Sequence, residues 1–568
     1  MSLFEANLSA IASRWPATAR RIRETADRSG MEMMEITRTR GGEPTARLRR
    51  EGAAAAYLHS RVAPREEGER RAAAVPPSTG FIVAFGPGLF YTVEALLARH
   101  ESAVVVVVEP EPAMLRAALA WRDLRTCLAD ERLRLLTADL ASLEAAAAYV
   151  AQNYLPILHG AFYLEVPRAR AEACGGQLRI IAEAAREQVA DLAVQRRFGV
   201  RWFSNAVRNV ATLPSQTVEI PLGETAVVAA AGPSLEEDIA ELDGSIPVVS
   251  TDTAGPALLQ RGIRPAAVVS LDCQQVSYHH LLTAGAEARG IPAVCDLSTA
   301  PTVLRASGPA VTTVTAYPLA QLLKHRFPEL PSVDGGGGNV TQAAVDFVVG
   351  RGVRKIHVVG ADFSYPAGHP YARDTYLYRH FRASETRLEP ASTRLFELVH
   401  ADPETRTVIE ADGGRTYHTP KLDRYRERFL TAVEKLDAEV LLGPPGATSR
   451  PCGASRIHLS SPDGAGPDSS PDSGPDPRAE SLRLPPLEKR REALHFYAET
   501  LAGLTLPPGP PASALERLED TVREHWYTLL PLAAAFLDAE IDVRGASATL
   551  RSARSWAVEH LRRVLARP

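Results

Sequence analysis

The chain has 568 residues, more than one hydrophobic core can organise, so about three or four domains are expected. A hydrophobic share of 45% and a charged share of 23% are ordinary globular values, and a formal net charge of −4 gives no electrostatic case for nucleic acid binding. Five scattered cysteines indicate a reducing compartment and no structural zinc. No apolar run is long enough for a membrane span and no signal sequence is recognisable, so a cytoplasmic protein is expected.

The first part of the chain predicts a helical and hairpin segment over residues 1–78 and a Rossmann-like domain with helices over residues 79–213. In the second of these, an apolar strand ends at the turn Gly86-Pro87-Gly88, and the next strand ends in Glu109. This spacing is typical of half of a dinucleotide or S-adenosylmethionine fold, but the third glycine of the fingerprint is missing. We therefore favour a structural domain here over a cofactor site.

The central part of the chain is organised around an apolar strand, residues 226–231, that ends at Gly232-Pro233. Ser234 and Glu237 have the spacing of a capping box, which predicts that a helix begins directly after the turn. Free amides at such a helix N-terminus are suited to phosphate, so the turn is a candidate phosphate loop. An ordinary strand-to-helix turn is the alternative.

Three further apolar strands of this part each lead to a carboxylate, namely Asp252, Asp272 and Asp362. In open α/β sheets ligands bind outside the carboxyl ends of the strands, so these residues predict a site beside the first loop. A second loop, residues 335–338, consists of four glycines and precedes Asn339, a good N-cap. It lacks the Gly-Lys-Ser/Thr of a Walker A loop, and we interpret it as a loop that faces a ligand.

The loop that follows Asp362 contains His369, the histidine placed directly after a strand of the predicted site. Histidine has an ordinary pKa near neutrality, which makes His369 a general-base candidate, although a solvent-facing loop histidine is the alternative. The same loop carries further polar groups that are candidates for binding a substrate: Ser364, Tyr365, Tyr371 and Arg373.

Beyond the central part, residues 443–485 are rich in Pro, Ser, Gly and Asp and predict a disordered linker, because this composition buries no core. Residues 486–568 have helical periodicity and predict a small bundle that serves packing or a possible homo-oligomer. The expected fold class is α/β, with a Rossmann-like N-terminal domain, a central doubly wound parallel-sheet domain over residues 214–442, and a C-terminal α-helical bundle after the linker.

Several segments in order resemble the motility-associated factor (Maf) proteins of bacteria. They are AAGPSLEEDI, VVSLDCQ, GGGGNVTQAAVDFVVGRG, HVVGADFSYPAGHPYARDTYLY and TYHTPKLDRY, preceded by LHSRVAPREEGER and the FGPG turn. The resemblance covers about residues 1–440, and the central domain is also similar to 6-hydroxymethylpterin diphosphokinases (MptE-like).

The resemblance implies a cytoplasmic glycosyltransferase that moves a nonulosonic acid, pseudaminic or legionaminic, from its CMP-activated form to serine or threonine of flagellin. It implies a sialyltransferase-like central sheet that works without a metal or other cofactor. Two alternatives stay open. One is pyrophosphoryl transfer from ATP as in the pterin diphosphokinases, which would require Mg²⁺, and the other is a non-catalytic flagellar assembly or chaperone protein.

The resemblance and the residue patterns together assign roles, with no metal ligand among them. His369, Asp362 and Asp272 are the expected catalytic residues, and Arg373 is expected to meet the sugar carboxylate as a bidentate pair. The expected nucleotide-binding residues are Gly232, Pro233, Ser234, Asp252, Gly337, Gly338 and Asn339, and the expected substrate-binding residues are Ser364, Tyr365, Tyr371, Arg373 and Thr419. The family often has glutamine and lysine where this chain has Ala361 and His369.

Overall fold

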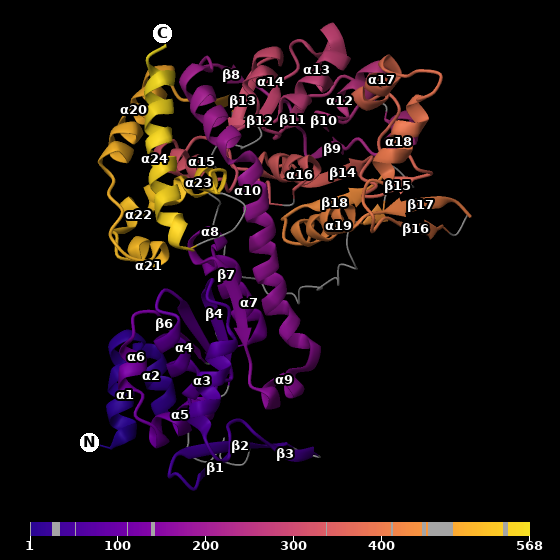
Figure 1. The fold of residues 1–568 in the computed structure, drawn as a ribbon. Coiled ribbons are helices and arrows are strands. Elements are labelled where there is room, and N and C mark those ends of the chain that lie inside the picture. The colour runs from indigo at the N-terminus through magenta and orange to yellow at the C-terminus, as the bar shows by residue number, and fades with distance from the viewer. Residues whose placement is uncertain are drawn as a thin grey trace, which may run out of the picture. The chain divides into compact units, whose positions relative to one another are not determined.

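The computed structural model describes residues 2–24, 34–50, 53–110, 112–137, 142–242, 244–336, 338–410, 413–445, 450–451, 481–537 and 543–567. The chain forms two compact units, residues 1–199 with 503–556, and residues 200–502 with 557–568. Each unit contains a parallel β-sheet with helices, so the predicted α/β class is confirmed (Figure 1). No helix within the described ranges is long and apolar enough to cross a membrane.

The first unit contains a four-stranded parallel sheet in the order β6-β5-β4-β7, the arrangement of half a Rossmann fold. β4 and β5 are buried along their whole length, as their continuous apolar runs require of a parallel sheet covered on both faces. A separate antiparallel sheet has the order β1-β2-β3. The strands are β1 (Met34–Arg38), β2 (Pro44–Arg50), β3 (Ala53–Tyr57), β4 (Thr79–Phe85), β5 (Val104–Glu109), β6 (Leu133–Thr137) and β7 (Ala161–Glu165).

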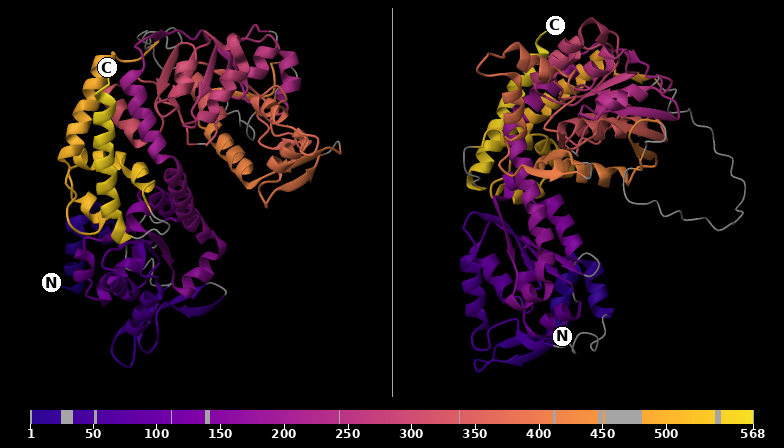
Figure 2. Two further views of the ribbon diagram at one scale, coloured as in Figure 1. Left: turned by 45° about the horizontal axis from the view of Figure 1, so that its top comes forward. Right: turned by 90° about the vertical axis from the view of Figure 1, so that its right-hand side faces the viewer.

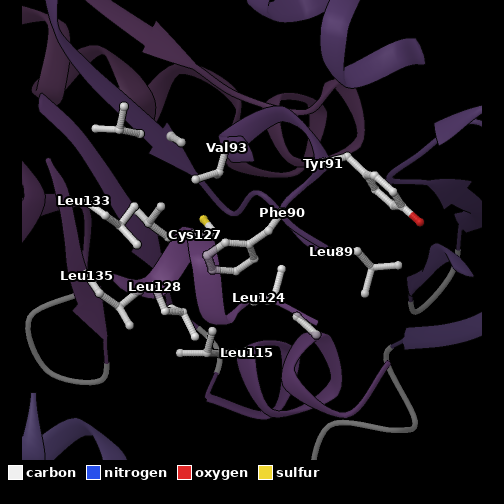
Figure 3. Packing of buried hydrophobic residues seen from close by; sticks show 14 of the residues in the cluster. Leu89, Phe90, Tyr91, Val93, Leu115, Leu124, Cys127, Leu128, Leu133 and Leu135 are labelled. Atoms are coloured by element: carbon white, nitrogen blue, oxygen red, sulfur yellow. The ribbon is translucent and has the colours of Figure 1, made fainter. Parts of the chain in front are cut away.

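The helices of the first unit surround a core in which the ring of Phe90 lies among Leu115, Leu124 and Leu128 (Figure 3). Phe90 has a left-handed backbone with φ of 67°, a costly conformation that its complete burial helps to hold. The helices are α1 (Leu3–Arg14), α2 (Pro16–Glu24), α3 (Pro64–Ala74), α4 (Tyr91–Arg99), α5 (Pro112–Trp121), α6 (Arg125–Ala129), α7 (Leu143–Asn153), α8 (Pro156–His159), α9 (Arg168–Cys174), α21 (Pro511–Glu516), α22 (Asp520–Thr528) and α23 (Leu530–Ala534).

The C-terminal helices, expected from sequence to form one bundle over residues 486–568, are divided between the two units. In the first unit, a Cβ on Gly199 of α10 (Arg179–Thr212) would lie only 1.7 Å from the carbonyl oxygen of Pro531 in α23. In the second unit, the buried Arg490 of α20 (Leu487–Gly503) donates to the carbonyl of Val210 at 2.7 Å. The helices therefore bury side chains against α10 as well as against one another. Both α10 and α24 (Val543–Leu565) contribute to the two units.

The second unit is built on an eight-stranded sheet in the order β13-β12-β11-β10-β9-β14-β18-β19, parallel from β13 to β18. The chain runs outward from β9 to β13 and then returns to β14 on the other side of β9, so the predicted doubly wound sheet is confirmed. Its switch point lies between β9 and β14. The strands are β9 (Thr225–Ala229), β10 (Val248–Thr251), β11 (Ala267–Ser270), β12 (Ala293–Asp296), β13 (Ala310–Thr313), β14 (Lys355–Val359), β18 (Glu439–Leu442) and β19 (Arg450–Pro451).

Helices cover both faces of this sheet, with α12, α13 and α14 on one face and α16 on the other (Figure 1). A small antiparallel sheet, β15-β17-β16, follows β14, and its hairpin of β16 and β17, orange in Figure 2, projects from the rest of the unit. The elements are α11 (Leu235–Asp238), α12 (Gly255–Gln260), α13 (Tyr278–Ala284), α14 (Pro301–Ala306), α15 (Pro318–Arg326), α16 (Val340–Gly350), β15 (Tyr365–Pro366), α17 (Tyr376–Ala383), α18 (Ala391–Val399), β16 (Arg406–Ile409), β17 (Arg415–His418) and α19 (Pro420–Val433).

The two ends of the predicted linker belong to the folded unit, while residues 452–480 lie outside the described residues. β19 pairs with β18, and β20 (Leu482–Arg483) pairs with β8 (Thr217–Val218). Leu482 and Leu484 are only 7% and 2% exposed. The predicted linker of residues 443–485 therefore begins too early and ends too late. At its C-terminal end, the average composition hides Leu482 and Leu484, which have the period-two spacing of a strand.

The contribution of Leu484 to the free energy of unfolding can be compared with that of residues 452–480. Replacing residues 452–480 by a Gly/Ser segment of equal length should leave the thermal unfolding midpoint unchanged, because that composition buries no core. Leu484→Ala should lower the free energy of unfolding by about 2–5 kcal/mol. Leu388→Ala is the control, since Leu388 is 86% exposed. Limited proteolysis should cut first within 452–480, and earlier cleavage in the central sheet would contradict this boundary.

Candidate functional site at the carboxyl ends of the central strands

The first glycine loop brings the ends of β9 and β14 into direct contact. The Gly232 amide donates to the Gly360 carbonyl at 2.8 Å, and the Ser234 amide donates to Oδ2 of Asp362 at 3.1 Å. A Cβ on Gly232 would lie 2.1 Å from the same Oδ2 and 2.6 Å from the Gly360 oxygen. Glycine is therefore required at 232 because two strand ends meet there, whatever ligand the loop holds.

The predicted capping box of this loop is wrong. Ser234 has a helical backbone, its side chain caps no amide, and α11 has only four residues. Burial raises the pKa of Asp362, and the neighbouring Glu237 raises it further. A phosphate at this loop would have to share the Ser234 amide with a protein carboxylate. The nucleotide-binding role of Gly232, Pro233 and Ser234 stays a prediction.

The second glycine loop precedes a longer helix. Oδ1 of Asn339 accepts from the Gln342 amide at 2.9 Å, which confirms the predicted N-cap of the 11-residue α16. Gly338 has φ of +72°, and a Cβ there would lie 2.9 Å from the ring of Tyr425 in α19. The ammonium of Lys421 lies 5.4 Å from the centre of that ring. A helix N-terminus and a cation thus occur together beside this loop, and the neighbouring Gly337 lies outside the described residues.

Of the three predicted acids, Asp252 and Asp272 lie near each other, and Asp362 lies near Asp238. At the ends of β10 and β11, burial raises the pKa of Asp272 and the Asp252 charge adds to the effect. At the ends of β9 and β14, burial raises the pKa of Asp238 and the Asp362 charge adds to it. Within the described ranges, no group of three or more His, Cys, Asp or Glu side chains is arranged to hold a metal ion.

Asp252 is held rigidly by its neighbours, whereas Asp272 keeps free acceptor capacity. Oδ1 of Asp252 accepts from the Thr253 amide at 2.7 Å, and its Oδ2 accepts from the Ser270 hydroxyl at 2.7 Å. Oδ1 of Asp272 accepts from the Gln274 amide at 2.8 Å, and the Gln274 side chain reaches its Oδ2 only at 3.3 Å. Asp272 is half-buried and therefore remains the more accessible of the two carboxylates.

His280 of α13 is a site residue that the sequence reasoning missed. Its Nε2 lies 3.3 Å from the hydroxyl of Thr253, and its ring meets Tyr376 of α17 edge to face with centres 4.5 Å apart. Burial lowers the pKa of His280, against the opposing effect of Asp252 and Asp272. The only sequence signal was a histidine soon after a strand-end acid, and no spacing rule connects it to Tyr376, which is 96 positions away.

Of the two predicted substrate-binding tyrosines, Tyr371 lies near Asp252, whereas Tyr365 lies near Asp402. Burial raises the pKa of Tyr371 to about 12, and the neighbouring groups Tyr365, Tyr376, Asp252 and Tyr425 add to it, while the side chain remains 38% exposed. The amide of the next residue, Ala372, donates to the Ala231 carbonyl at 2.9 Å and anchors the loop over the end of β9. Tyr425 lies beside Gly338, so the second glycine loop and Asp252 both lie in the neighbourhood of Tyr371.

His369 and Arg373 of the same loop lie near Glu236 of α11. Nδ1 of the exposed His369 is 3.1 Å from the Tyr378 hydroxyl. The Arg373 guanidinium pairs with Glu236 of α11, with N···O distances of 2.8 and 2.9 Å. The loop is also strained, since Phe363 and Ala367 have φ of 47° and 49°. Arg373 is therefore already engaged by a protein carboxylate.

Two remaining predicted residues make local bonds. The Ser364 hydroxyl donates to the carbonyl of Asp362 at 3.2 Å. The Thr419 hydroxyl accepts from the Leu422 amide at 3.2 Å and caps α19, so a structural role accounts for this buried threonine.

In the first unit, protein side chains fill the space beside the Gly86-Pro87-Gly88 turn. Arg170 pairs with the buried Glu109 at 3.2 Å, and a Cβ on Gly86 would lie 2.8 Å from Nε of Arg170. Nε2 of His59 accepts from the Leu89 amide at 2.8 Å, and burial lowers the pKa of His59 to about 3. The acid that would meet a ribose is thus paired with arginine, which supports the structural interpretation of this domain.

Comparisons with known proteins agree with this architecture. Residues 202–368 match the family model described as 6-hydroxymethylpterin diphosphokinase MptE-like. Two uncharacterized proteins of Treponema pallidum (strain Nichols) are 36% identical over 104 residues (18% of this chain, 36% of the relative) and 31% identical over 144 residues (24% and 69%). The chain thus spans about a third of the first relative. A Maf glycosyltransferase from Magnetospirillum magneticum has a TM-score of 0.61 at 15% identity, covering 99% of this chain and 95% of that one.

The fold and the site define a two-unit α/β protein with an MptE-like domain. The chain belongs to the same family as the Treponema pallidum protein that it matches at 31% identity over 69% of its length. Its fold is that of a Maf glycosyltransferase, so the resemblance to the Maf proteins is confirmed.

The contact between the ends of β9 and β14 generates a stability prediction. Gly232→Ala should lower the free energy of unfolding by about 1–3 kcal/mol, because the added methyl overlaps Asp362 and the Gly360 carbonyl. Gly223→Ala is the matched control, since a Cβ there meets nothing closer than 3.7 Å. Chemical denaturation of both variants measures the difference, and equal stability of the two would contradict the contact.

Proposed function

We propose that this protein is a glycosyltransferase that moves a nonulosonic acid from its CMP-activated form to serine or threonine of flagellin, in the cytoplasm. The observation that supports the proposal is that Gly338, Tyr425, Tyr371 and Asp252 lie in one neighbourhood at the carboxyl ends of the strands. It places hydroxyl groups and carboxylates next to a helix N-terminus, in a fold shared with a Maf glycosyltransferase.

The donor phosphate is assigned to the second glycine loop. A CMP-sugar has one bridging phosphate, which the first amides of α16, those of Val340 and Thr341, can hold while Lys421 supplies a positive charge. We expect the first loop, with its Asp362 carboxylate, to contact the nucleotide through neutral groups. The tyrosines Tyr365 and Tyr371 would form the wall beside the sugar, because their rings bring apolar surface and their hydroxyls bring hydrogen bonds.

Transfer requires a base for the acceptor. The oxygen of the acceptor hydroxyl bonds to the anomeric carbon, the bond from that carbon to the phosphate oxygen breaks, and CMP leaves with the electron pair while the hydroxyl proton goes to the base. We assign this role to Asp272, because its raised pKa makes it a stronger base than an ordinary carboxylate. His369 is the alternative base, and its Nδ1 lies 3.1 Å from the Tyr378 hydroxyl.

A pterin diphosphokinase activity is the second candidate, and the match of residues 202–368 to the MptE-like family model favours it. Transfer of diphosphate from ATP normally requires Mg²⁺ and several carboxylates in one place. A non-catalytic assembly or chaperone role, and a homo-oligomer through the C-terminal helices, stay predictions without a specific observation.

Nucleotide binding separates the two enzymatic candidates. Isothermal titration calorimetry should detect CMP binding in the absence of metal, and CMP at a hundred times its dissociation constant should add about 2.7 kcal/mol to the free energy of unfolding. UMP serves as the control for recognition of the cytosine ring of CMP. Binding of ATP with Mg²⁺ but not of CMP would overturn the glycosyltransferase proposal in favour of the diphosphokinase.

Two substitutions decide which side chain is the general base that takes the proton of the acceptor hydroxyl. Asp272→Asn should lower the rate of transfer from a CMP-nonulosonate to a flagellin peptide by roughly 10² to 10⁴, with CMP affinity kept, and His369→Ala should leave it nearly unchanged. Since the deprotonated carboxylate is the active form, the wild-type rate should rise with pH through a pKa above the ordinary aspartate range. The opposite ranking of the two variants would assign the proton to His369.

A further inference from the structure

The small antiparallel sheet of the second unit ends in an exposed edge strand. In the order β15-β17-β16, β16 stands at one end and pairs with β17 on its inner side. All four residues of β16 are exposed, and Ile409 is 62% exposed. The hairpin of β16 and β17 projects from the unit (Figure 2), so another chain can reach its outer side. An edge of this kind is a template for pairing with a further strand.

The hydrogen bonds of the hairpin decide which backbone groups of β16 point outward. The Glu410 amide donates across the hairpin to the Gly414 carbonyl at 2.8 Å. In an antiparallel pair, successive residues face the partner strand and the opposite side in turn. Val408 therefore bonds towards β17, while Thr407 and Ile409 point their amides and carbonyls to the outer side.

The bonds of β17 to its other neighbour agree with this alternation. The carbonyl of Arg415, which lies opposite Ile409, accepts from the Ala367 amide on the β15 side at 2.8 Å. Arg415 thus does not use this carbonyl towards β16. Among the described residues, the backbone groups of Thr407 and Ile409 have no hydrogen-bond partner. Two amides and two carbonyls of the edge are consequently available to a further strand.

The alternation also fixes how a second β16 could pair with the first. Two antiparallel copies form hydrogen bonds where outward-pointing residues face each other, so Thr407 can face Ile409 of the second copy. By symmetry the reverse pair forms as well, and Val408 then lies opposite its own copy. In this register Arg406 faces Glu410 of the second copy at both ends, which gives two pairs of opposite charge.

The neighbouring registers lack this charge complementarity at Glu410. A register centred on Thr407 would set Glu410 opposite Glu404, and like charges directly opposite each other are destabilising. A register centred on Ile409 would set Glu410 opposite Val408. The charges therefore favour the register centred on Val408.

We propose that β16 is a docking surface for a second copy of this chain, joined by antiparallel pairing centred on Val408. Arg406 already forms an ion pair with Asp423. A guanidinium has five N–H donors, so Arg406 can also meet Glu410 of the second copy. The proposed surface lies on the projecting hairpin and does not involve the C-terminal helices.

Apolar side chains beside the edge add to this surface. Ile409 and Thr407 share one face of the sheet with Tyr417, which pairs with Thr407. The ring of His400 meets Tyr417 with centres 5.1 Å apart and stacks on Phe396 at 4.0 Å. Phe396 is 60% exposed. Pairing of the two edges would bring the Ile409 side chains of both copies together on this face.

Sedimentation velocity of the full chain over a series of concentrations measures the dissociation constant of the dimer. Thr407→Pro should raise this constant about 10- to 100-fold, because it removes an outward amide from each copy and hence two hydrogen bonds. A proline is tolerated on an edge strand whose N–H points outward, so the hairpin itself should persist, as circular dichroism can check. Thr407→Val is the matched control, since it keeps the amide and should leave the constant unchanged.

A charge exchange tests the register. Arg406→Glu and Glu410→Arg should each weaken the homodimer, because like charges then face each other at both ends. An equimolar mixture of the two variants should dimerise again, since each end of the mixed pair unites a glutamate with an arginine. Glu219→Arg is the control, because Glu219 is an exposed glutamate outside the hairpin.

Three results would overturn the proposal, and none of them bears on glycosyl transfer. A wild-type dissociation constant above about 1 mM would exclude the second copy as the partner and leave the edge to an extended segment of another protein. A dimer that is equally tight in Thr407→Pro would place the contact on a different surface. A mixture of the charge variants that stays monomeric would exclude the register centred on Val408.

Discussion

The contact between the ends of β9 and β14 is the constraint on which the central unit depends. Gly232 and Gly360 allow the two loops to touch, since a Cβ on either residue would lie within 2.6 Å of a backbone or carboxylate oxygen of the other loop. The hydrogen bond from the Gly232 amide to the Gly360 carbonyl joins the loop after β9 to the loop after β14. The crevice of a doubly wound sheet forms at this switch point, so the site depends on this contact.

Asp252 and Asp272 differ in how many of their hydrogen-bond acceptor positions are already used. Asp252 is buried and accepts from Thr253 and Ser270, while Asp272 is half-buried and accepts mainly from one amide. A carboxylate with unused lone pairs is the one that can take a proton or a hydrogen bond from a ligand. The structure thus distinguishes a positioning acid from an available one, although both follow strands in the same way.

The two Rossmann-like sheets of this chain illustrate why a fold alone does not define a site. In the first unit, Arg170 and His59 fill the space beside the glycine turn, and Glu109 forms an ion pair with Arg170. In the second unit, tyrosines lie near the strand ends, and one of them, Tyr371, is partly exposed. The difference lies in side chains contributed by distant segments, because in both sheets the parallel strands run outward from one strand and then return to its other side.

The sequence by itself determined the α/β class, the parallel strands, the acids at their ends and the Asn339 cap, because apolar periodicity and capping are local properties of the chain. Only the tertiary structure decided which side chains meet. Arg373 pairs with Glu236 across 137 positions, and Asn205 bonds to Cys273 across 68, so neither contact has a sequence period. Which residues are buried follows from these long-range contacts. For this reason the positions of His280 and of strand β20 could not be recognised from the sequence.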